Sequence, residues 1–113
     1  MRIWLLAAVC AAIVVPAALA ATPTLQGTVG PGFTITLKQG GKAVKTLKAG
    51  KYVFEISDKS NIHNFHLTGP GVNKSTTVAF KGTQTWTLSL KKGTYTYVCD
   101  PHKAFMKGSF KVT

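Results

Sequence analysis

The chain has 113 residues and a formal net charge of +11, because 14 Lys and Arg residues stand against only 3 Asp and Glu residues. This length allows one small domain, and the acids Glu55, Asp58 and Asp100 offer no evident carboxylate pair for general acid–base catalysis, so we expect a single-domain protein that is not an enzyme. Lysine supplies every positive charge after Arg2, which argues against a nucleic-acid partner because bidentate recognition of phosphate and guanine favours arginine.

The N-terminal segment has the pattern of a secretory signal peptide. A short basic start precedes the unbroken apolar run of residues 3–15, Pro16 interrupts that run, and Ala18-Leu19-Ala20 forms an A-x-A cleavage site. We therefore expect residues 1–20 to be removed and residues 21–113 to form a domain exported to the periplasm or the extracellular space. An uncleaved membrane anchor is the alternative, because the apolar segment is long enough to span a bilayer, but the proline and the small residues after it favour cleavage.

Short runs of alternating apolar and polar residues follow, separated by glycine and proline. Thr, Val, Ile and aromatic residues dominate these runs, which is typical of β-strands. The clearest runs cover residues 33–37, 52–56, 85–90 and 95–98. Because no segment shows helical periodicity over three turns, the pattern predicts an all-β Greek-key sandwich or barrel of about seven to eight strands.

Two segments share the pattern Leu-x-x-Gly-x-Tyr, and they end at Tyr52 and Tyr95. The pattern resembles the tyrosine corner of Greek-key sandwiches, in which a Tyr hydroxyl hydrogen-bonds to backbone a few residues upstream. Two copies are too few to indicate a repeat protein. The resemblance of both segments to tyrosine corners supports the sandwich prediction.

Side chains that bind soft metals are concentrated in two segments. Cys99, His102 and Met106 place a thiol, an imidazole and a thioether in one short stretch near the C-terminus, and His63 and His66 supply imidazoles upstream. Two His, one Cys and one Met are the ligands of a mononuclear electron-transfer copper site, with a trigonal His₂Cys set and a long axial Met. A structural zinc site would usually show more thiols or a tight histidine pair.

Removal of the signal peptide would leave Cys99 as the only thiol, so no disulfide could form within the chain. The alternative for Cys99 is a cysteine that is buried without binding a metal. The alternative for Met106 is packing in the hydrophobic core. A free thiol in an oxidising compartment is a liability unless it is hidden or ligated. Export therefore favours a metal thiolate.

Strand alternation distinguishes the two upstream histidines. Residues 63, 65 and 67 share one face and read His-Phe-Leu, whereas residues 62, 64 and 66 share the other. We therefore expect His63 to point inward and His66 outward, although a bulge in the strand would let His66 replace His63. By the same alternation Cys99 shares the inward face of Tyr95 and Tyr97.

Residues 62–112 resemble the plastocyanin-like cupredoxins, the small type 1 blue copper proteins. His63-Asn64 matches the first ligand of that family and its Asn neighbour, and residues 93–102 match its penultimate strand and ligand loop. Residues 106–112 match its axial Met and last strand. Plastocyanins place one more residue between the last His and the Met, and amicyanins one fewer, so the spacing here is intermediate.

The resemblance implies one copper ion per chain that cycles between Cu(I) and Cu(II). His63, Cys99 and His102 would be its equatorial ligands and Met106 its axial ligand. Asn64 would tie the two ligand segments together by hydrogen bonds. The apolar surround of the metal would include four residues: Phe65, Tyr97, Pro101 and Phe105.

A protein of this family would carry single electrons between redox partners through the exposed edge of His102. Pro101 and Phe105, with residues 69–71 nearby, would form an apolar docking patch, and Lys103 and Lys107 would make it cationic. We therefore expect a redox partner with an acidic docking surface, a monomeric protein and no small-molecule substrate. The alternatives are a copper-trafficking or copper-scavenging protein of the same fold, and a metal-free sandwich that acts as a binding module.

Overall fold

The computed structural model of the protein describes residues 21–113, and the predicted signal peptide lies outside the described residues. This part of the chain contains ten β-strands and one short 3₁₀-helix, η1, at Asp100–His102. The strands are β1 (Thr24–Val29), β2 (Ile35–Gln39), β3 (Lys42–Ala43), β4 (Thr46–Leu47), β5 (Gly50–Asp58), β6 (His66–Gly69), β7 (Val72–Ser75), β8 (Gly82–Leu90), β9 (Gly93–Val98) and β10 (Lys107–Val112).

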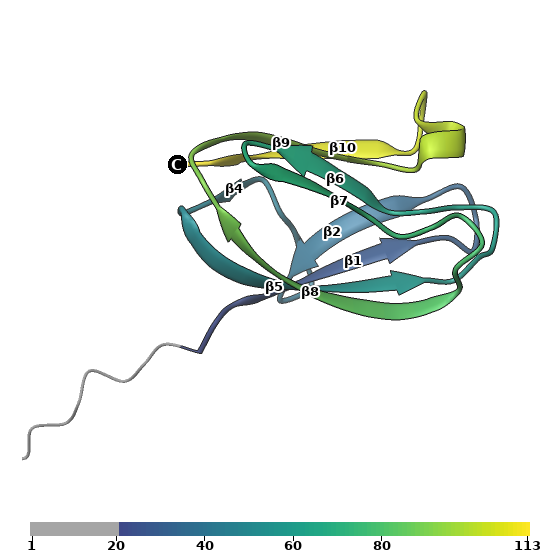
Figure 1. The fold of residues 1–113 in the computed structure, drawn as a ribbon, viewed down its shortest axis with the longest axis horizontal. Coiled ribbons are helices and arrows are strands. Elements are labelled where there is room, and N and C mark those ends of the chain that lie inside the picture. Colours follow the sequence, from purple (N-terminus) through teal and green to yellow (C-terminus); the bar gives the residue numbers. More distant parts are fainter. Residues whose placement is uncertain (1–20) are drawn as a thin grey trace, which may run out of the picture.

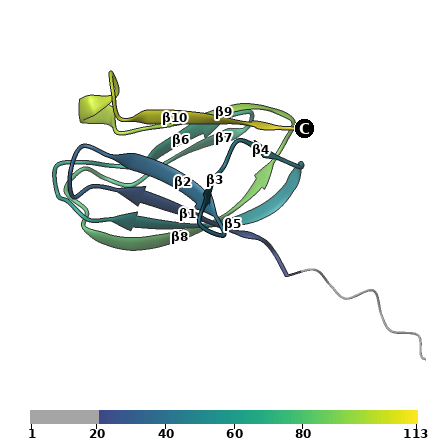
Figure 2. The same ribbon diagram turned by 180° about the vertical axis from the view of Figure 1, so that it is seen from behind.

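The strands form two five-stranded sheets that face each other (Figure 1). The strand order is β3-β2-β1-β5-β8 in one sheet and β4-β10-β9-β6-β7 in the other. Neighbouring strands are antiparallel except for β1 with β5 and β4 with β10, which are parallel. The chain passes between the two sheets after β3, β4, β5, β7 and β8, and the architecture is the predicted Greek-key sandwich. The reverse view shows β2 and the short β3 in front (Figure 2).

The four strands that the sequence pattern predicted are present as β2, β5, β8 and β9. The number of strands exceeds the prediction because β3 and β4 have only two residues each, too few to show alternation. The first predicted strand also began too early, since Phe33 and Thr34 lie before β2. There Gly30, with φ 73°, donates its N–H to the Thr34 carbonyl at 2.9 Å and closes a turn.

Aromatic side chains fill much of the space between the sheets. Tyr95 stacks on Phe110 with ring centroids 5.3 Å apart, and Phe65 stacks on Tyr97 at 5.5 Å. All four side chains are buried, and alternation in β9 and β10 accounts for Tyr95, Tyr97 and Phe110. The Phe65–Tyr97 stack continues the core toward Cys99, which follows β9 directly.

Both predicted tyrosine corners are confirmed. The Tyr52 hydroxyl donates to the Lys48 carbonyl at 2.7 Å, and the Tyr95 hydroxyl donates to the Lys91 carbonyl at 2.8 Å. The Tyr95 oxygen also accepts the Lys91 N–H at 2.8 Å and lies 3.3 Å from the Pro70 carbonyl oxygen. Because Tyr95 lies near the start of β9, this contact places the turn of residues 69–71 at the end of the sandwich remote from His102. The expectation that this turn borders the docking patch is therefore wrong.

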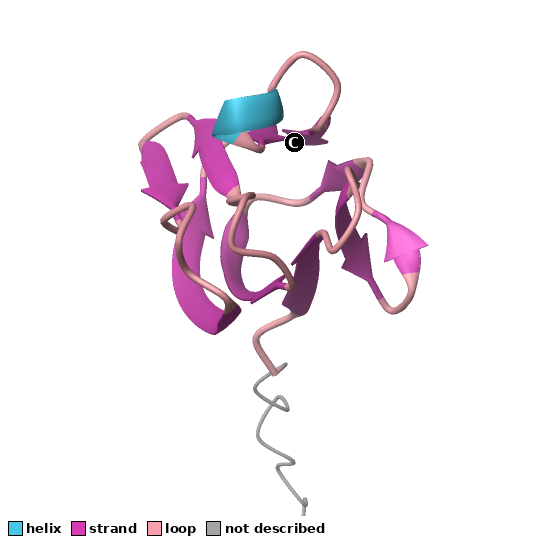
Figure 3. Cartoon of the chain, turned by 90° about the vertical axis from the view of Figure 1, so that its right-hand side faces the viewer, coloured by secondary structure: helices cyan, strands magenta, loops and turns pink. Residues whose placement is uncertain are grey.

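The candidate ligands lie at the opposite end of the sandwich. In the view from that end, η1 lies over the rim of one sheet, in the connection between β9 and β10 (Figure 3).

Within residues 21–113, no helix is long and apolar enough to cross a membrane.

Candidate metal centre

Three of the predicted ligand side chains converge at this end of the sandwich. The Nδ1 atoms of His63 and His102 are 3.1 Å apart, and the Cys99 Sγ atom lies 3.6 Å from each of them. Within the described residues, these three side chains are the group of His, Cys, Asp and Glu residues that could hold a metal ion. His63 and Cys99 are fully buried, and His102 is partly exposed.

The segment from Cys99 to Met106 is held in shape by its own backbone. The Cys99 N–H donates to the Met106 carbonyl at 3.0 Å, and the His102 N–H donates to the Cys99 carbonyl at 3.0 Å. The Met106 N–H closes the loop by donating to the His102 carbonyl at 2.9 Å. Pro101 at the start of η1 fits this turn because its fixed φ suits a first helical position and it needs no donor there. The loop therefore presents the Cys99 and His102 side chains in a defined relative orientation.

His63 comes from the connection between β5 and β6. The strand begins only at His66, so the predicted strand alternation does not extend back to His63. His63 is nevertheless fully buried as predicted, whereas Asn64, expected on the outward face, is only 3% exposed. A Cβ atom on Gly30 would lie 3.3 Å from the His63 ring, which shows how closely the loop before β2 covers this histidine.

The triangle of ligand atoms has the dimensions of a metal site. The point equidistant from the two Nδ1 atoms and the sulfur lies about 2 Å from each, close to the metal–imidazole bond of about 2.0 Å and the metal–thiolate bond of about 2.3 Å known for zinc. Two imidazoles and one thiolate are also the equatorial donors that copper takes in electron-transfer sites. The residues therefore fit a copper ion.

The Nε2 atom of His63 is buried without a hydrogen-bond partner within residues 21–113. Among the described residues, the buried side-chain polar atoms without a hydrogen-bond partner are His63 Nε2 and Asp58 Oδ2. Burial raises the pKa of the Asp58 carboxyl, while a hydrogen bond from the Ser60 backbone and the charge of His63 act in the opposite direction.

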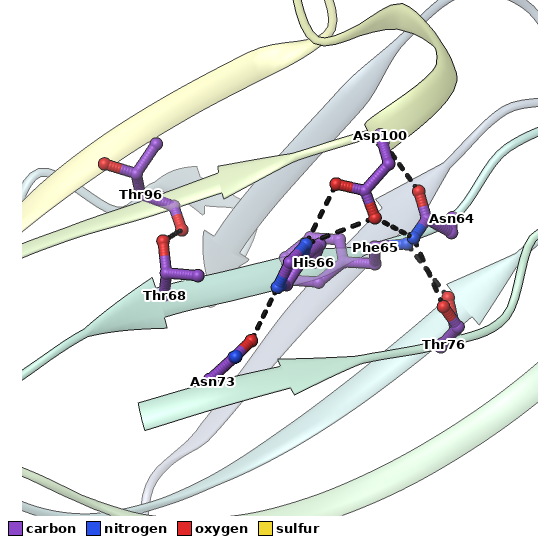
Figure 4. A network of polar contacts seen from close by, with 8 residues as sticks. All are labelled: Asn64, Phe65, His66, Thr68, Asn73, Thr76, Thr96 and Asp100. Atoms are coloured by element: carbon purple, nitrogen blue, oxygen red, sulfur yellow. Dashed lines mark hydrogen bonds and ion pairs between the residues drawn. The ribbon is translucent and has the colours of Figure 1, made fainter. Parts of the chain in front are cut away.

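Asn64 joins the two ligand segments (Figure 4). Its Oδ1 accepts the Asp100 N–H at 2.7 Å, and its Nδ2 donates to Asp100 Oδ2 at 2.7 Å and to the Thr76 carbonyl at 3.2 Å. The Thr76 hydroxyl in turn accepts the Phe65 N–H at 2.9 Å. These bonds fix the residue after His63 to the residue after Cys99.

Comparison with known proteins agrees with this geometry. Residues 32–113 match the model of the copper-binding proteins of the plastocyanin/azurin family. The chain belongs to this family. A search of curated proteins found no match.

Solved structures of rusticyanin are similar in fold. One, described as a copper protein, is 19% identical with a TM-score of 0.62, and the match covers 81% of this chain and 78% of rusticyanin. Reduced rusticyanin is 22% identical with a TM-score of 0.59 and coverages of 81% and 79%. Rusticyanin from Thiobacillus ferrooxidans is 25% identical with a TM-score of 0.51 and coverages of 81% and 77%. The chain therefore has the cupredoxin fold.

Met106, the remaining ligand that the cupredoxin pattern suggests, is 1% exposed. Its backbone is hydrogen-bonded to Cys99 and His102, so the residue lies next to both in the loop. Burial at this position agrees with a weak axial ligand and also with core packing.

The predicted docking residues are on the surface. Pro101, Lys103, Phe105 and Lys107 are all exposed, and Phe105 is 61% exposed. Phe65 and Tyr97 are buried, as expected for an apolar surround, but the exposure of Pro101 and Phe105 shows that these two residues border the site on its solvent side.

Phe33 also borders the site, although no sequence pattern indicates it. This residue is 59% exposed, yet its ring centroid lies 5.4 Å from that of His63, 5.0 Å from that of His102 and 5.8 Å from that of Phe105. It covers the two histidines from the loop between β1 and β2. Its place at the start of an alternating run gave no signal of this role, because the path of the loop depends on the turn at Gly30.

His66 lies outside the group of candidate ligands. Its Nδ1 is 2.9 Å and 3.1 Å from the two carboxylate oxygens of Asp100, and its Nε2 is 2.6 Å from Asn73 Oδ1. The hydrogen bond with Asp100 raises the pKa of His66, partial burial lowers it, and the Asn73 bond raises it further. Burial raises the pKa of Asp100, but the hydrogen bonds from His66 and Asn64, with the charges of His66 and Lys103, outweigh that effect and hold it below its usual value.

Proposed function

We propose that this cupredoxin is an exported mononuclear type 1 copper protein that carries single electrons between redox partners. One copper ion per chain would be held by His63, Cys99 and His102, with Met106 as the axial ligand. The observation that carries the proposal is the triangle of two imidazole nitrogens and one thiol sulfur, with edges of 3.1 and 3.6 Å, at the buried end of a cupredoxin sandwich.

Copper in such a site supplies a one-electron couple, Cu(I)/Cu(II), whose potential depends on the axial ligand, the apolar surround and hydrogen bonds near the sulfur. The chain would contribute rigidity, since Cys99 and His102 lie in a loop closed by backbone hydrogen bonds and His63 precedes the Asn64 clamp. A fixed ligand set suits electron transfer because the same geometry serves both oxidation states. The full burial of Cys99 and His63 would keep water from the sulfur.

His102 would be the point of contact with a redox partner. It is the least buried of the three equatorial residues, and the exposed rings of Phe33 and Phe105 lie 5.0 Å and 5.7 Å from its ring. Lys103 and Lys107 border this apolar surface. A partner with an acidic rim and an apolar centre would fit it, and its encounter would be accelerated by charge attraction.

Export is part of the proposal because the N-terminal segment has a signal-peptide pattern and a buried single thiol suits an oxidising compartment when a metal occupies it. Cleavage after residue 20 would leave residues 21–113 as the mature domain. Finding residues 1–20 on the protein recovered from its native compartment would support the anchored alternative.

The test is copper uptake by the purified apoprotein. Cu(II) is added to the wild-type domain and to the variants Cys99→Ser and Thr68→Ala, and the visible spectrum is recorded. We expect an intense thiolate-to-copper band at one equivalent for the wild type and Thr68→Ala, and no such band for Cys99→Ser. Colourless binding of Cu(I) alone would support copper trafficking, and the absence of any binding would support a metal-free binding module.

A further inference from the structure

His66 makes three side-chain polar contacts outside the ligand group. It lies at the start of β6, and its ring bridges the Asp100 carboxylate, at 2.9 and 3.1 Å, and the Asn73 side chain on β7, at 2.6 Å (Figure 4). Asp100 stands between Cys99 and His102 in the chain. An outward-facing histidine that only covered surface would need none of these contacts.

Both ring nitrogens of His66 face oxygen atoms. An ionised carboxylate can only accept hydrogen bonds, so Nδ1 donates to Asp100. With the Asn73 amide oriented so that Oδ1 faces the ring, Nε2 donates as well. A histidine that donates from both nitrogens is an imidazolium, and neither nitrogen has a lone pair left for a metal ion.

We propose that His66 is a positioning residue of the metal centre: its imidazolium holds the Asp100 carboxylate, and through Asp100 it holds the segment that carries Cys99 and His102. This inference rests on the proposed function. It assigns a role to the histidine that the sequence left as an alternative ligand.

The contacts form a continuous path from a strand edge to the ligands. Asn73 on β7 orients the His66 ring, His66 orients the Asp100 carboxylate, and the second carboxylate oxygen accepts the Asn64 amide at 2.7 Å. Asn64 also accepts the Asp100 N–H at 2.7 Å and directly follows His63. The Asp100 carboxylate therefore accepts hydrogen bonds both from His66 and from Asn64, and it lies in the segment that carries Cys99 and His102.

Asp100 needs this support because its side chain is 46% exposed. In the absence of His66, water would compete for the carboxylate, and only Asn64 would hold it. Both supports donate to an ionised carboxylate, and the imidazolium adds an opposite charge that the Asn64 amide lacks. Losing it would leave the site assembled but would widen the range of positions open to the Cys99 segment.

The test compares copper-loaded wild type with His66→Ala, His66→Gln and Asp100→Asn. Thr68→Ala is the matched control, since Thr68 lies on the same strand and bonds across to the Thr96 carbonyl at 3.5 Å without touching the ligand loop. The readouts are the position and width of the thiolate-to-copper band and the rate of copper loss to a Cu(I) chelator. A merely structural surface contact would leave the band unchanged.

We expect His66→Ala to keep the band but to shift and broaden it, and to speed copper loss by about tenfold, the low end of the effect of groups that orient metal ligands indirectly. His66→Gln, which keeps one neutral donor, should recover part of the change. The double variant His66→Ala/Asp100→Asn should lose copper no faster than Asp100→Asn alone, because His66 acts through the Asp100 carboxylate, which the second substitution removes.

Two results would overturn the inference. Spectra and copper-loss rates of His66→Ala equal to those of Thr68→Ala would show that His66 has no influence on the centre, while the wild-type band would leave the proposed function standing. Complete loss of the band in both His66→Ala and His66→Gln, with the variants still folded by circular dichroism, would show that His66 is itself a ligand. If the wild-type domain showed no band at all, the proposed function would fail first.

Discussion

The Nδ1 atoms of His63 and His102 lie 3.1 Å apart, although the two residues are separated by thirty-nine positions in the chain. One comes from the connection between β5 and β6 and the other from the connection between β9 and β10. Because β6 pairs with β9, the two connections emerge side by side at the same end of one sheet. The convergence of the candidate ligands is therefore a consequence of strand pairing, and the whole sandwich supports it.

Substitution of Met106 by leucine tests the axial ligand. Leucine has a similar volume, so the substitution at this buried position should cost less than about 1.5 kcal/mol in stability. Loss of a weak donor disfavours Cu(II), so we expect the reduction potential to rise on the order of 60 mV, equivalent to a tenfold change in the one-electron equilibrium. Voltammetry of the copper-loaded variant measures the shift. An unchanged potential would mean that Met106 serves only as a core residue.

The two tyrosine corners predict unequal losses of stability. Tyr95→Phe removes a hydroxyl that both accepts from and donates to Lys91, whereas Tyr52→Phe removes a single donation to Lys48. We expect about 2–3 kcal/mol of destabilisation for Tyr95→Phe and about 1 kcal/mol for Tyr52→Phe, since the first leaves a backbone N–H without its partner. Urea unfolding of the apoprotein gives both values. A larger loss of stability for Tyr52→Phe than for Tyr95→Phe would contradict the conclusion that the tyrosine corner at the start of β9 is the more stabilising one.

The His66–Asp100 pair predicts a pH dependence of stability. The pKa of His66 is raised above 6.5 in the folded protein, so its contribution is fully present below about pH 6.5 and is lost as the pH rises through the folded pKa. The pKa of Asp100 is lowered from 3.8, so its contribution is lost only as the pH falls through that lower value.

The free energy of unfolding of the apoprotein should therefore differ most between wild type and His66→Gln at about pH 5–6, and less at about pH 9. Both side chains are partly exposed, which limits the difference to roughly 0.2–1 kcal/mol. Denaturant unfolding at the two pH values measures it. A difference that grows with pH would have the wrong sign for an imidazolium–carboxylate pair.

The lysines beside His102 should accelerate reaction with an anionic oxidant. Lys103 and Lys107 flank the loop, whereas Lys92 and Lys111 lie at the other end of the β9–β10 hairpin, where Val112 pairs with Gly93. At about 10 mM ionic strength, Lys103→Gln/Lys107→Gln should slow oxidation of the reduced protein by hexacyanoferrate(III) several-fold more than Lys92→Gln/Lys111→Gln. At about 500 mM salt, the stopped-flow rates of the two double variants should become equal. Equal effects of the two pairs at low salt would refute local steering.

The strands and the inward direction of Cys99 could be predicted because alternation is a local property. Tyr95, Tyr97 and Cys99 share one face of β9 and its continuation, and all three are buried. The same rule misplaced Asn64, since the segment before His66 is a loop and its hydrogen bonds to Asp100 and Thr76 draw the side chain inward. Alternation fails where the strand ends.

Phe33 and the partners of His66 could not be predicted from local patterns. Phe33 reaches the histidines only because the turn at Gly30 directs the loop between β1 and β2 over the end of the sandwich. Asn73 and Asp100 meet His66 because β7, β6 and β9 are neighbours in one sheet. Such contacts depend on the packing of segments that are distant in sequence.

We propose that the chain cycles a single electron through a preformed copper site. Cyclic voltammetry of the copper-loaded domain, with the visible spectrum recorded before and after many cycles, measures this cycling. We predict a reversible one-electron wave and full recovery of the thiolate-to-copper band. An irreversible wave with release of copper on oxidation or reduction would contradict the account and would indicate that the site stores or delivers the metal.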